Sequence, residues 1–263
     1  MDLNLRNKIA IVTGASRGLG FATAEVLAQE GARVALNSRN PENLEKASQR
    51  INHLTDSPVL PIAGDVSQPE TAQRLVEKVV HEWGGVDILI TNAGGPPAGK
   101  FENFSLEDWQ NAVNLNFLSA VNLIRAALPY LRRSTAPAVL TITSISVKQP
   151  IEGLVLSNSV RAATIGLTKS LALELGKEGI RFNSILPGWT ATERVEQLLQ
   201  HRAQTNQSTV EEERQKIAAQ TALGRLADPR EFARVAVFLV SPAASYITGS
   251  MIAVDGGFYR GTL

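Results

Sequence analysis

The sequence predicts a doubly wound α/β fold, and three observations support this prediction. Short aliphatic runs alternate along the chain with longer amphipathic segments. The aliphatic runs are nearly continuous, which is typical of strands in a parallel sheet that helices cover on both faces. No repeat, low-complexity tract or Pro/Gly/Ser linker divides the 263 residues, so we expect a single domain over residues 1–263.

Seven aliphatic runs are predicted to be the strands, and they cover residues 8–13, 33–37, 59–63, 86–91, 138–143, 180–186 and 251–254. The segments between them are predicted to be helical, and the clearest are residues 21–31, 106–133, 157–176 and 231–240. Residues 190–220 interrupt this alternation with a polar segment that follows the end of a strand. Two interpretations of this segment are open, a helical flap over a site and a solvated surface insertion.

The composition excludes several classes of site and partner. The chain has 26 basic and 25 acidic residues, and this balance gives no reason to expect nucleic acid or an anionic membrane as a partner. It has no cysteine, which excludes disulfides and thiolate metal ligands, and no histidine–carboxylate cluster indicates a metal site. No apolar run is long enough to span a membrane, and the first residues lack a signal-peptide pattern. We therefore expect a soluble, cytoplasmic protein.

A glycine-rich turn follows the first predicted strand, in IAIVTGASRGLG (9–20). Gly14 suits a tight turn, Gly18 lets the backbone approach a pyrophosphate, and Gly20 lets the next helix pack on the strand. The N-terminus of that helix would present free N–H groups to phosphate oxygens. The spacing is G-x3-G-x-G rather than the commoner G-x-G-x-x-G, so the position between a strand and a helix carries the prediction of a dinucleotide site.

The end of the second predicted strand indicates which dinucleotide is preferred. A carboxylate at this place would receive the two ribose hydroxyls of adenosine, but the sequence has Asn37, Ser38 and Arg39. Arg39 and Arg17 are able to pair with a 2′-phosphate, and Ser38 is able to donate to it. NADP(H) is therefore favoured as the cofactor, and NAD(H) is the alternative if both arginines are only solvated.

Five segments follow one another in a characteristic order and spacing: TGASRGLG (13–20), GDVS (64–67), NAG (92–94), PGWTAT (187–192) and VDGG (254–257). With them, the chain resembles the short-chain dehydrogenase/reductase family over essentially its whole length. Reductases of 3-oxoacyl-(acyl-carrier-protein) thioesters are nearest in pattern. The resemblance implies a Rossmann-type, doubly wound, seven-stranded parallel sheet in the order 3-2-1-4-5-6-7, with helices on both faces.

The resemblance, together with the end of the second strand, also implies which residues contact the cofactor. They are Gly14, Ser16, Arg17, Gly18, Leu19, Gly20, Ser38, Arg39, Asp65, Val66, Asn92, Ala93, Gly94, Arg161, Pro187, Gly188, Thr190 and Thr192. Asp65 and Val66 are assigned to the adenine, and residues 187–192 to the nicotinamide.

The family's active site corresponds to four catalytic positions in this chain, and two of them differ. Its asparagine and serine correspond to Asn116 and Ser144, whereas its tyrosine and lysine correspond to Ser157 and Arg161. Ser144 is able to donate a hydrogen bond to a carbonyl oxygen on which negative charge develops. Ser157 cannot protonate that oxygen as a phenol does, because its hydroxyl is less acidic and its side chain is shorter by an aromatic ring. Arg161 keeps donors that could hold ribose hydroxyls, with a different reach.

The sequence therefore does not identify the group that donates the proton. An ordered water could deliver the proton if it is held by Asn116, Ser157 or Ser159. Three other side chains are weaker candidates, namely Lys148, Tyr259 and His201. Their alternative interpretations are an exposed loop lysine, a tyrosine packed at an interface and a solvated histidine.

Two functional hypotheses follow. The first is an NADP(H)-dependent oxidoreductase that interconverts a carbonyl and a secondary alcohol, with a 3-oxoacyl thioester as one candidate substrate and with an atypical proton donor. The second is a catalytically degenerate NADP(H)-binding protein that acts as a sensor or assembly partner, which the substitutions at Ser157 and Arg161 favour. In a third hypothesis cofactor binding is lost as well, and the glycine-rich turn argues against it.

The substrate pocket and the oligomeric state are predicted less directly. The pocket walls are expected from residues 95–104, residues 149–156 and Trp189 onward, which are mostly apolar and suit a non-ionic or acyl-chain small molecule. The helices 106–133 and 157–176 have apolar faces, and in the family such helices pair across a dimer. The resemblance therefore implies a homotetramer or homodimer, with the alternative that these faces cover only the sheet.

Overall fold

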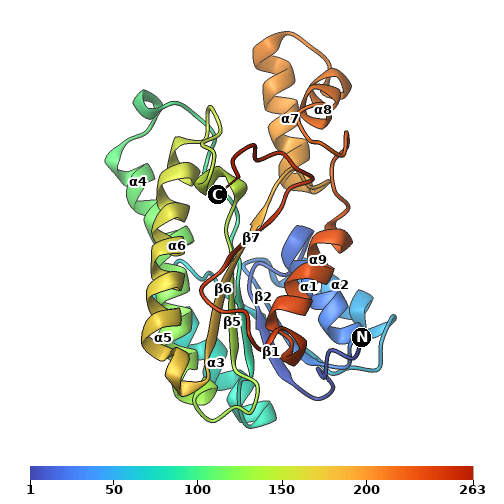
Figure 1. The fold of residues 1–263 in the computed structure, drawn as a ribbon, viewed down its shortest axis with the longest axis vertical. Coiled ribbons are helices and arrows are strands. Elements are labelled where there is room, and N and C mark those ends of the chain that lie inside the picture. Colours follow the sequence, from blue (N-terminus) through green and yellow to red (C-terminus); the bar gives the residue numbers. More distant parts are fainter. Residues whose placement is uncertain (263) are drawn as a thin grey trace.

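The computed structural model describes residues 1–262 and contains one sheet of seven parallel strands in the order β3-β2-β1-β4-β5-β6-β7 (Figure 1). The strands are β1 (Ile9–Val12), β2 (Arg33–Ser38), β3 (Val59–Ala63), β4 (Ile88–Thr91), β5 (Ala138–Ile142), β6 (Arg181–Pro187) and β7 (Met251–Val254). The predicted fold class and strand order are confirmed. The strand bounds differ from the prediction by at most two residues, at the start of β4.

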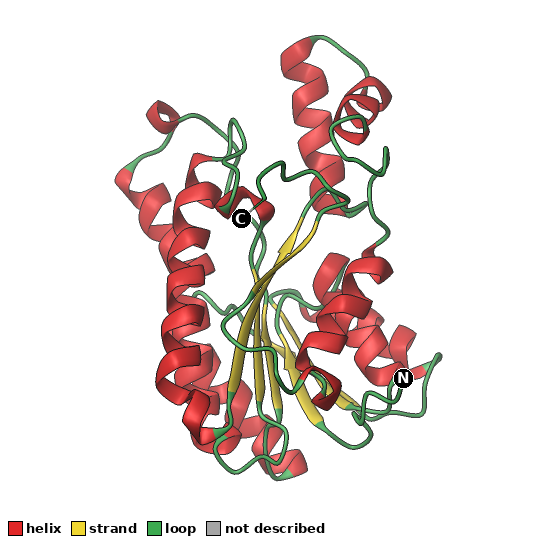
Figure 2. Cartoon of the chain, in the orientation of Figure 1, coloured by secondary structure: helices red, strands yellow, loops and turns green. Residues whose placement is uncertain are grey.

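Helices cover both faces of the sheet, as Figure 2 shows. One face is covered by α1 (Gly18–Gln29), α2 (Pro41–Asn52) and α9 (Pro229–Val240). The other face is covered by α3 (Pro69–Trp83), α5 (Ser119–Leu131) and α6 (Val155–Leu175). Strand β1 alternates between the two layers, since Ala10 and Val12 pack with the first set of helices and Ile11 with the second. Burial on both faces explains why the strands are apolar without a break.

The predicted helix 106–133 is not a single α-helix. It consists of α4 (Leu106–Val113), a π-helical turn (Asn114–Leu118) and α5. Ser105 caps α4 by accepting the N–H of Asp108. The π-helical turn contains Asn116, one of the predicted site residues, and turns of this kind often mark functional positions.

Residues 190–220 form a pair of helices that projects beyond the carboxyl end of the sheet, at the top of Figure 1. The helices are α7 (Glu193–Asn206) and α8 (Val210–Ala218). Leu199 of α7 and Ile217 of α8 are fully buried in one cluster with Trp189 and Phe258. The segment is therefore helical and packed, and its action as a flap stays a prediction.

Four short 3₁₀ helices complete the described structure, at Phe101–Asn103, Ile145–Val147, Gly176–Glu178 and Pro242–Ala244. Within residues 1–262, no helix has both the length and the apolar character that crossing a membrane requires.

Candidate active site

The segments that the sequence singled out lie at the carboxyl end of the sheet. Residues 13–20 follow β1, residues 37–39 lie at the end of β2, residues 64–66 follow β3 and residues 92–94 follow β4. Since the strands are parallel, their carboxyl ends lie at one edge. The direction of winding reverses between β1 and β4, and open α/β sheets bind ligands at such a switch point.

The glycine loop is fixed by its own backbone and by Asn92. Gly14 and Gly18 have φ angles of 58° and 59°, in the left-handed region that favours glycine. A Cβ atom on Gly20 would overlap the carbonyl oxygen of Gly14 and lie 2.7 Å from Nδ2 of Asn92. That Nδ2 donates to the Gly14 carbonyl over 3.2 Å, and the hydroxyl of Thr13 donates to the Asn92 carbonyl over 2.7 Å. Asn92 thus supports the loop in this structure, and its contact with a cofactor stays a prediction.

The N-terminus of α1 has the properties of a phosphate site. The helix begins at Gly18, and within the described chain no side chain caps it and no acidic residue occupies its first turn. Its first N–H groups and the positive end of its dipole are therefore available to an anion. Ser16 and Leu19, on either side of the loop's end, are half-buried. A dinucleotide pyrophosphate fits this cradle, since the loop leaves no room for a side chain at Gly14 or Gly20.

The end of β2 carries no carboxylate. Asn37 is buried, and its side-chain amide donates to carbonyl groups at the end of β3. Ser38 is 9% exposed, and its hydroxyl donates to a backbone carbonyl over 3.4 Å. Arg39 is exposed, and so is Arg17, which forms an ion pair with Glu193 at the start of α7. The predicted 2′-phosphate ligands are accessible, and Arg17 already has an anionic partner. At the end of β3, Asp65 is half-buried and Val66 is buried.

The PGWTAT segment connects β6 to α7 beside the glycine loop. Pro187 closes β6, and the N–H of Gly188 donates to a carbonyl of β7 over 3.0 Å. Thr192 caps α7, and its methyl group would lie 3.8 Å from a Cβ atom on Gly18. Thr190 is buried between these contacts. The structure therefore brings the predicted nicotinamide and phosphate segments next to each other.

Ser144 and Asn116 lie at the same end of the sheet, after β5 and in the π-helical turn. Ser144 is half-buried, and its Oγ accepts the N–H of Ser146 at 3.1 Å, which leaves its own O–H to be donated elsewhere. Nδ2 of Asn116 donates to the carbonyl of Gly94 over 3.0 Å. Ser157 is half-buried in the first turn of α6. Ser159 is exposed on the same helix.

Buried polar atoms without a partner are concentrated at this end of the molecule. Among the described residues five side-chain atoms are buried and make no hydrogen bond, and four of them follow β5 or β6 or belong to the π-helical turn: Asn116 Oδ1, Ser146 Oγ, Trp189 Nε1 and Thr190 Oγ1. Such atoms are rare in folded proteins and are explained when a ligand or ordered water bonds them. They mark this region as the site.

Arg161 is directed into the protein. Its side chain is 8% exposed, and Nη1 donates to the carbonyls of Ile142 and Thr143 over 3.2 and 3.1 Å. Nη2 lies 3.5 Å from the carbonyl oxygen of Ala93. Burial lowers the pKa of the Arg161 guanidinium to about 10, and repulsion from Arg194 adds to this effect. Arg161 therefore ties the end of β5 to the NAG segment, and its predicted contact with ribose hydroxyls stays untested.

Arg194 is a site residue that the sequence did not reveal. It lies in the first turn of α7, and its Nη2 donates to the carbonyl of Pro96 over 2.7 Å. Its guanidinium also lies over Gly95, where a Cβ atom would be 3.4 Å from Nε. Burial lowers the pKa of Arg194. The only sequence signal was its position two residues after Thr192, so the contact with residues 95–96 could not be predicted.

The weaker proton-donor candidates occupy other environments. Lys148 is half-buried, with Nζ 5.1 Å from the centroid of the Tyr259 ring. Tyr259 packs against the cluster around Trp189 within its own chain. His201 is exposed on α7. Within the part of the chain that the structure describes, no group of three or more His, Cys, Asp or Glu residues could hold a metal ion.

Two of the expected pocket walls are joined to each other. The N–H of Gly99 donates to the carbonyl of Gly153 over 2.7 Å, which connects residues 95–104 to residues 149–156. The third wall begins at Trp189, which is buried and packs edge to face on Phe258 at 6.4 Å between ring centroids. Two surface depressions lie elsewhere, beside β3 and the end of α3, and contain none of the predicted site residues.

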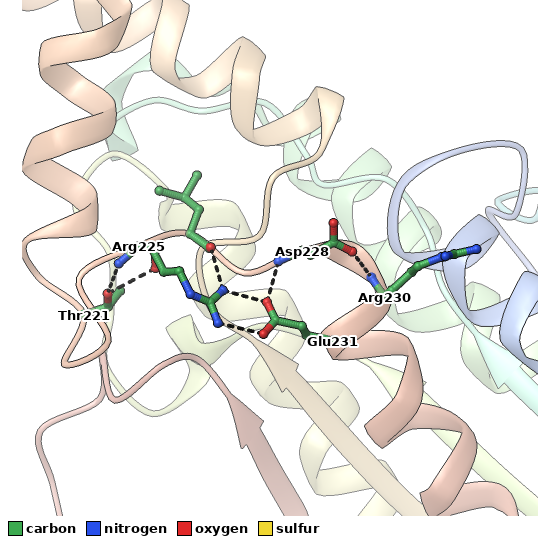
Figure 3. A network of polar contacts seen from close by, with 6 residues as sticks. Thr221, Arg225, Asp228, Arg230 and Glu231 are labelled. Atoms are coloured by element: carbon green, nitrogen blue, oxygen red, sulfur yellow. Dashed lines mark hydrogen bonds and ion pairs between the residues drawn. The ribbon is translucent and has the colours of Figure 1, made fainter.

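Residues 219–228, which connect α8 to α9, are stabilised by a polar network that Figure 3 shows, and we call them the return segment. Both Nη atoms of Arg225 bond the carboxylate of Glu231 at 2.7 Å, and that carboxylate also accepts the N–H of Asp228. The hydroxyl of Thr221 donates to the carbonyl of Arg225 over 3.2 Å. The N–H of Ala227 in the same segment donates to the carbonyl of Trp189 over 2.9 Å, so this network also supports the site.

The apolar helix faces are used mostly within the chain. Leu123 and Ala127 of α5 are buried against the sheet, and Leu171 of α6 packs on the same core. Leu106 and Leu173 are exposed on α4 and α6. The apolar stripes therefore do not themselves indicate a dimer surface, and the oligomeric state stays a prediction.

Comparisons with known proteins agree with this geometry. Residues 14–259 match the family model described as Enoyl-(Acyl carrier protein) reductase. The chain is 33% identical to the 3-oxoacyl-(acyl-carrier-protein) reductase of Vibrio cholerae over 257 residues, which cover 98% of this chain and 99% of that protein. It is 35% identical to a 3alpha-hydroxysteroid dehydrogenase of Mediterraneibacter gnavus over 260 residues, which cover 97% and 98% of the two chains.

The structure is also similar to that of L-sorbose reductase from Gluconobacter frateurii, solved in complex with NADPH and L-sorbose. The TM-score is 0.95 at 34% sequence identity, and the match covers 99% of this chain and 100% of the other. The names of these relatives give different substrates, so what they share with this chain is the fold and the oxidoreductase family.

Proposed function

The chain belongs to the short-chain dehydrogenase/reductase family of oxidoreductases, and from this premise we propose that it is an NADP(H)-dependent enzyme that interconverts a carbonyl and a secondary alcohol. The observation that carries the proposal is the glycine loop. Its backbone excludes side chains at Gly14 and Gly20 and leaves the N-terminus of α1 uncapped, which is what a pyrophosphate requires. A loop that served only the fold would not need this open helix end.

The residues proposed to hold the cofactor line the carboxyl end of the sheet. Gly18 and the first N–H groups of α1 would bind the pyrophosphate, and Arg17 and Arg39 would bind the 2′-phosphate. The NADPH complex of the sorbose reductase supports this choice over NAD(H). When bound, the reduced nicotinamide supplies a hydride to the carbonyl carbon.

Three side chains of this chain would act on the carbonyl. Ser144 would donate a hydrogen bond to the carbonyl oxygen, because its Oγ accepts one bond and retains its own proton. The free Oδ1 of Asn116 and the hydroxyl of Ser157 would hold a water that delivers the final proton. A positioned general acid contributes about 10²–10⁴ in rate. We therefore propose slow turnover through an atypical donor, and a 3-oxoacyl thioester is one candidate substrate.

NADPH oxidation tests this proposal directly. The purified protein is mixed with NADPH and a panel of 3-oxoacyl thioesters, ketones, sugars and aldehydes, and the absorbance of NADPH is followed. We expect consumption above background with at least one class, and a large loss in Ser144→Ala. Ser170→Ala, exposed on α6, serves as the control. No oxidation across the panel would contradict the enzyme proposal.

A second candidate is a catalytically silent NADP(H)-binding protein that acts as a sensor or assembly partner. The substitutions at Ser157 and Arg161 favour it, because they remove the family's phenol and ammonium. Calorimetry separates the two candidates, since tight NADPH binding without turnover of any carbonyl supports the silent protein. An absence of binding by either dinucleotide would support the third hypothesis, in which the cofactor site is lost.

Three further features belong to this proposal. We propose that α7 and α8 act as a flap over the substrate, that the protein works in the cytoplasm, and that it forms a homotetramer or homodimer. Light scattering tests the last of these, and a monomer would contradict it.

A further inference from the structure

We propose that the substrate carries a negatively charged oxyanion group, a carboxylate or a phosphate, which binds Arg194 beside Arg161. This inference rests on the proposed function, and it names the class of carbonyl compound that the site accepts. It goes beyond the expectation of a non-ionic or acyl-chain substrate, which considered only the apolar residues of the pocket walls and stays a prediction.

Three separate elements converge on residues 93–96, which lie just after β4. Arg161 of α6 reaches the carbonyl of Ala93, Asn116 of the π-helical turn bonds the carbonyl of Gly94, and Arg194 of α7 bonds the carbonyl of Pro96. Arg161 and Arg194 belong to different helices, so the fold rather than the local sequence brings them to this segment. Both contact the segment of residues 93–96.

The two guanidinium groups are brought together only by the fold, and neither has a carboxylate partner among residues 1–262. The carboxylate next to Arg194 in sequence, that of Glu193, pairs with Arg17 instead. Arg161 is 8% exposed, and repulsion from Arg194 contributes to the low pKa of Arg161. Two desolvated positive charges close to each other are costly unless an anion offsets them.

Of the two arginines, Arg194 has the larger number of unused hydrogen-bond donors. Among residues 1–262 its guanidinium donates only through Nη2 to Pro96, so most of its N–H groups have no acceptor in this part of the protein. A planar guanidinium with free donors suits bidentate binding of a carboxylate or phosphate. Arg161 has already committed Nη1 to two backbone carbonyls, so it would act mainly through its charge.

The cofactor does not account for this pair of charges. We assign its pyrophosphate to the N-terminus of α1 and its 2′-phosphate to Arg17 and Arg39, at the ends of β1 and β2, whereas Arg161 and Arg194 contact the segment that follows β4. The apolar walls, which include Ile151 and Trp189, would then hold the uncharged remainder of the substrate. A substrate with an anionic head and an apolar body fits both observations.

Calorimetry on the protein saturated with NADP⁺ tests the inference without any need for turnover. The probes are phenylpyruvate and 4-methyl-2-oxovalerate, each against its neutral amide, and dihydroxyacetone phosphate against dihydroxyacetone. We expect at least one anionic probe to bind about tenfold or more tightly than its neutral analogue. A preference confined to the oxo acids identifies a carboxylate site, and a preference confined to the phosphorylated probe identifies a phosphate site.

Variants show whether Arg194 carries the preference. Arg194→Gln should abolish the discrimination between anionic and neutral probes, and Arg194→Lys should keep part of it. Arg125→Gln removes the same charge from an exposed position on α5 and should leave the preference unchanged. Melting temperatures of all three variants are measured first, so that a folding defect is not read as lost binding.

Several results would overturn the inference. Equal binding of acids and amides by the wild type would remove the need for an anionic group. A loss of NADP⁺ affinity in Arg194→Gln, with the probe preference intact, would assign the guanidinium to the cofactor. Failure of the proposed function is distinguishable, because anion-selective binding without turnover contradicts the enzyme proposal alone.

Discussion

The glycine loop and the helix pair α7–α8 are stabilised by different interactions. Residues 13–20 are fixed by left-handed glycines, by close backbone contacts and by the amide of Asn92. The helix pair α7–α8 and the segment that follows it depend on charged side chains, since six of the seven ion pairs among the described residues involve residues 193–231. The glycine loop is therefore specified mainly by positions that must lack a side chain, whereas the helix pair is held largely by the charges of its own side chains.

This difference explains which changes each region tolerates. A glycine with no room for a Cβ atom cannot be replaced without moving the backbone around it. A side chain such as Arg161 can be exchanged while the helix that carries it stays in place. This agrees with the prediction that the family's phosphate cradle is retained in this chain, while Ser157 and Arg161 differ from the residues that the family has at two of its four catalytic positions.

The largest effect is expected from restoring the family's pair of catalytic residues. The double variant Ser157→Tyr/Arg161→Lys should raise the rate of carbonyl reduction by about 10²–10⁴, because a phenol beside an ammonium supplies the missing acid. The rate of NADPH oxidation measures this gain. Ser157→Phe/Arg161→Lys is the matched control, since it adds the ring without the hydroxyl.

The same two double variants test whether the other residues of the proposed active site can still support catalysis. If the tyrosine variant is folded, binds NADPH and still does not exceed the phenylalanine control, the remaining residues do not form a competent site. The melting temperature must be followed, because Arg161→Lys removes the guanidinium contacts with Ile142, Thr143 and Ala93.

A change in the glycine loop should have the next largest effect, on binding rather than on the rate of reduction. In Gly20→Ala the new methyl group would overlap the Gly14 carbonyl and crowd Asn92, so we expect NADPH affinity to fall by about a hundredfold, roughly 2.7 kcal/mol. Fluorescence titration measures the affinity. Gly176→Ala is the control, because a Cβ atom there meets nothing within 4 Å and its φ of −61° suits alanine. Unchanged affinity in Gly20→Ala would mean that the loop does not form the cradle.

Acid should weaken the ion pair of the return segment, and with it the stability of the folded protein. The ion pair with Arg225 and the N–H of Asp228 lower the pKa of Glu231 to about 2, from an ordinary value of 4.5. A carboxyl group with a lowered pKa in the folded protein stabilises it above pH 4.5, and this contribution is lost as the pH falls from about 4.5 to about 2. The melting temperature should fall less steeply over this range in Glu231→Gln than in the wild type. Parallel curves for the two proteins would contradict the assignment.

The fold and the nucleotide end could be predicted from the sequence because their signals are local. The strands are continuous apolar runs, and the first helix follows a glycine turn. The π-helical turn at Asn116 was not predicted, because the sequence through it has the periodicity of one helix. The direction of Arg161 and the contact of Arg194 with Pro96 were missed because they depend on which loops the sheet brings together. The identities of Ser157 and Arg161 predict an atypical proton donor, which stays a prediction, and the substrate had no local signal.

The smallest effect on cofactor affinity is expected where the two regions are in contact, at the ion pair between Arg17 of the glycine loop and Glu193 of α7. Exposed pairs of this kind contribute about 0–1 kcal/mol. In Glu193→Gln, Arg17 is released to bind a 2′-phosphate, so NADPH affinity should rise about two- to fivefold while NADH affinity stays the same. Titration with both dinucleotides measures the ratio of the two dissociation constants, and Arg17→Gln should change that ratio in the opposite direction. An equal change in affinity for NADH and NADPH would show that Glu193 acts through the position of α7 rather than on the 2′-phosphate. The two regions would then be coupled through α7 instead of through competition for Arg17.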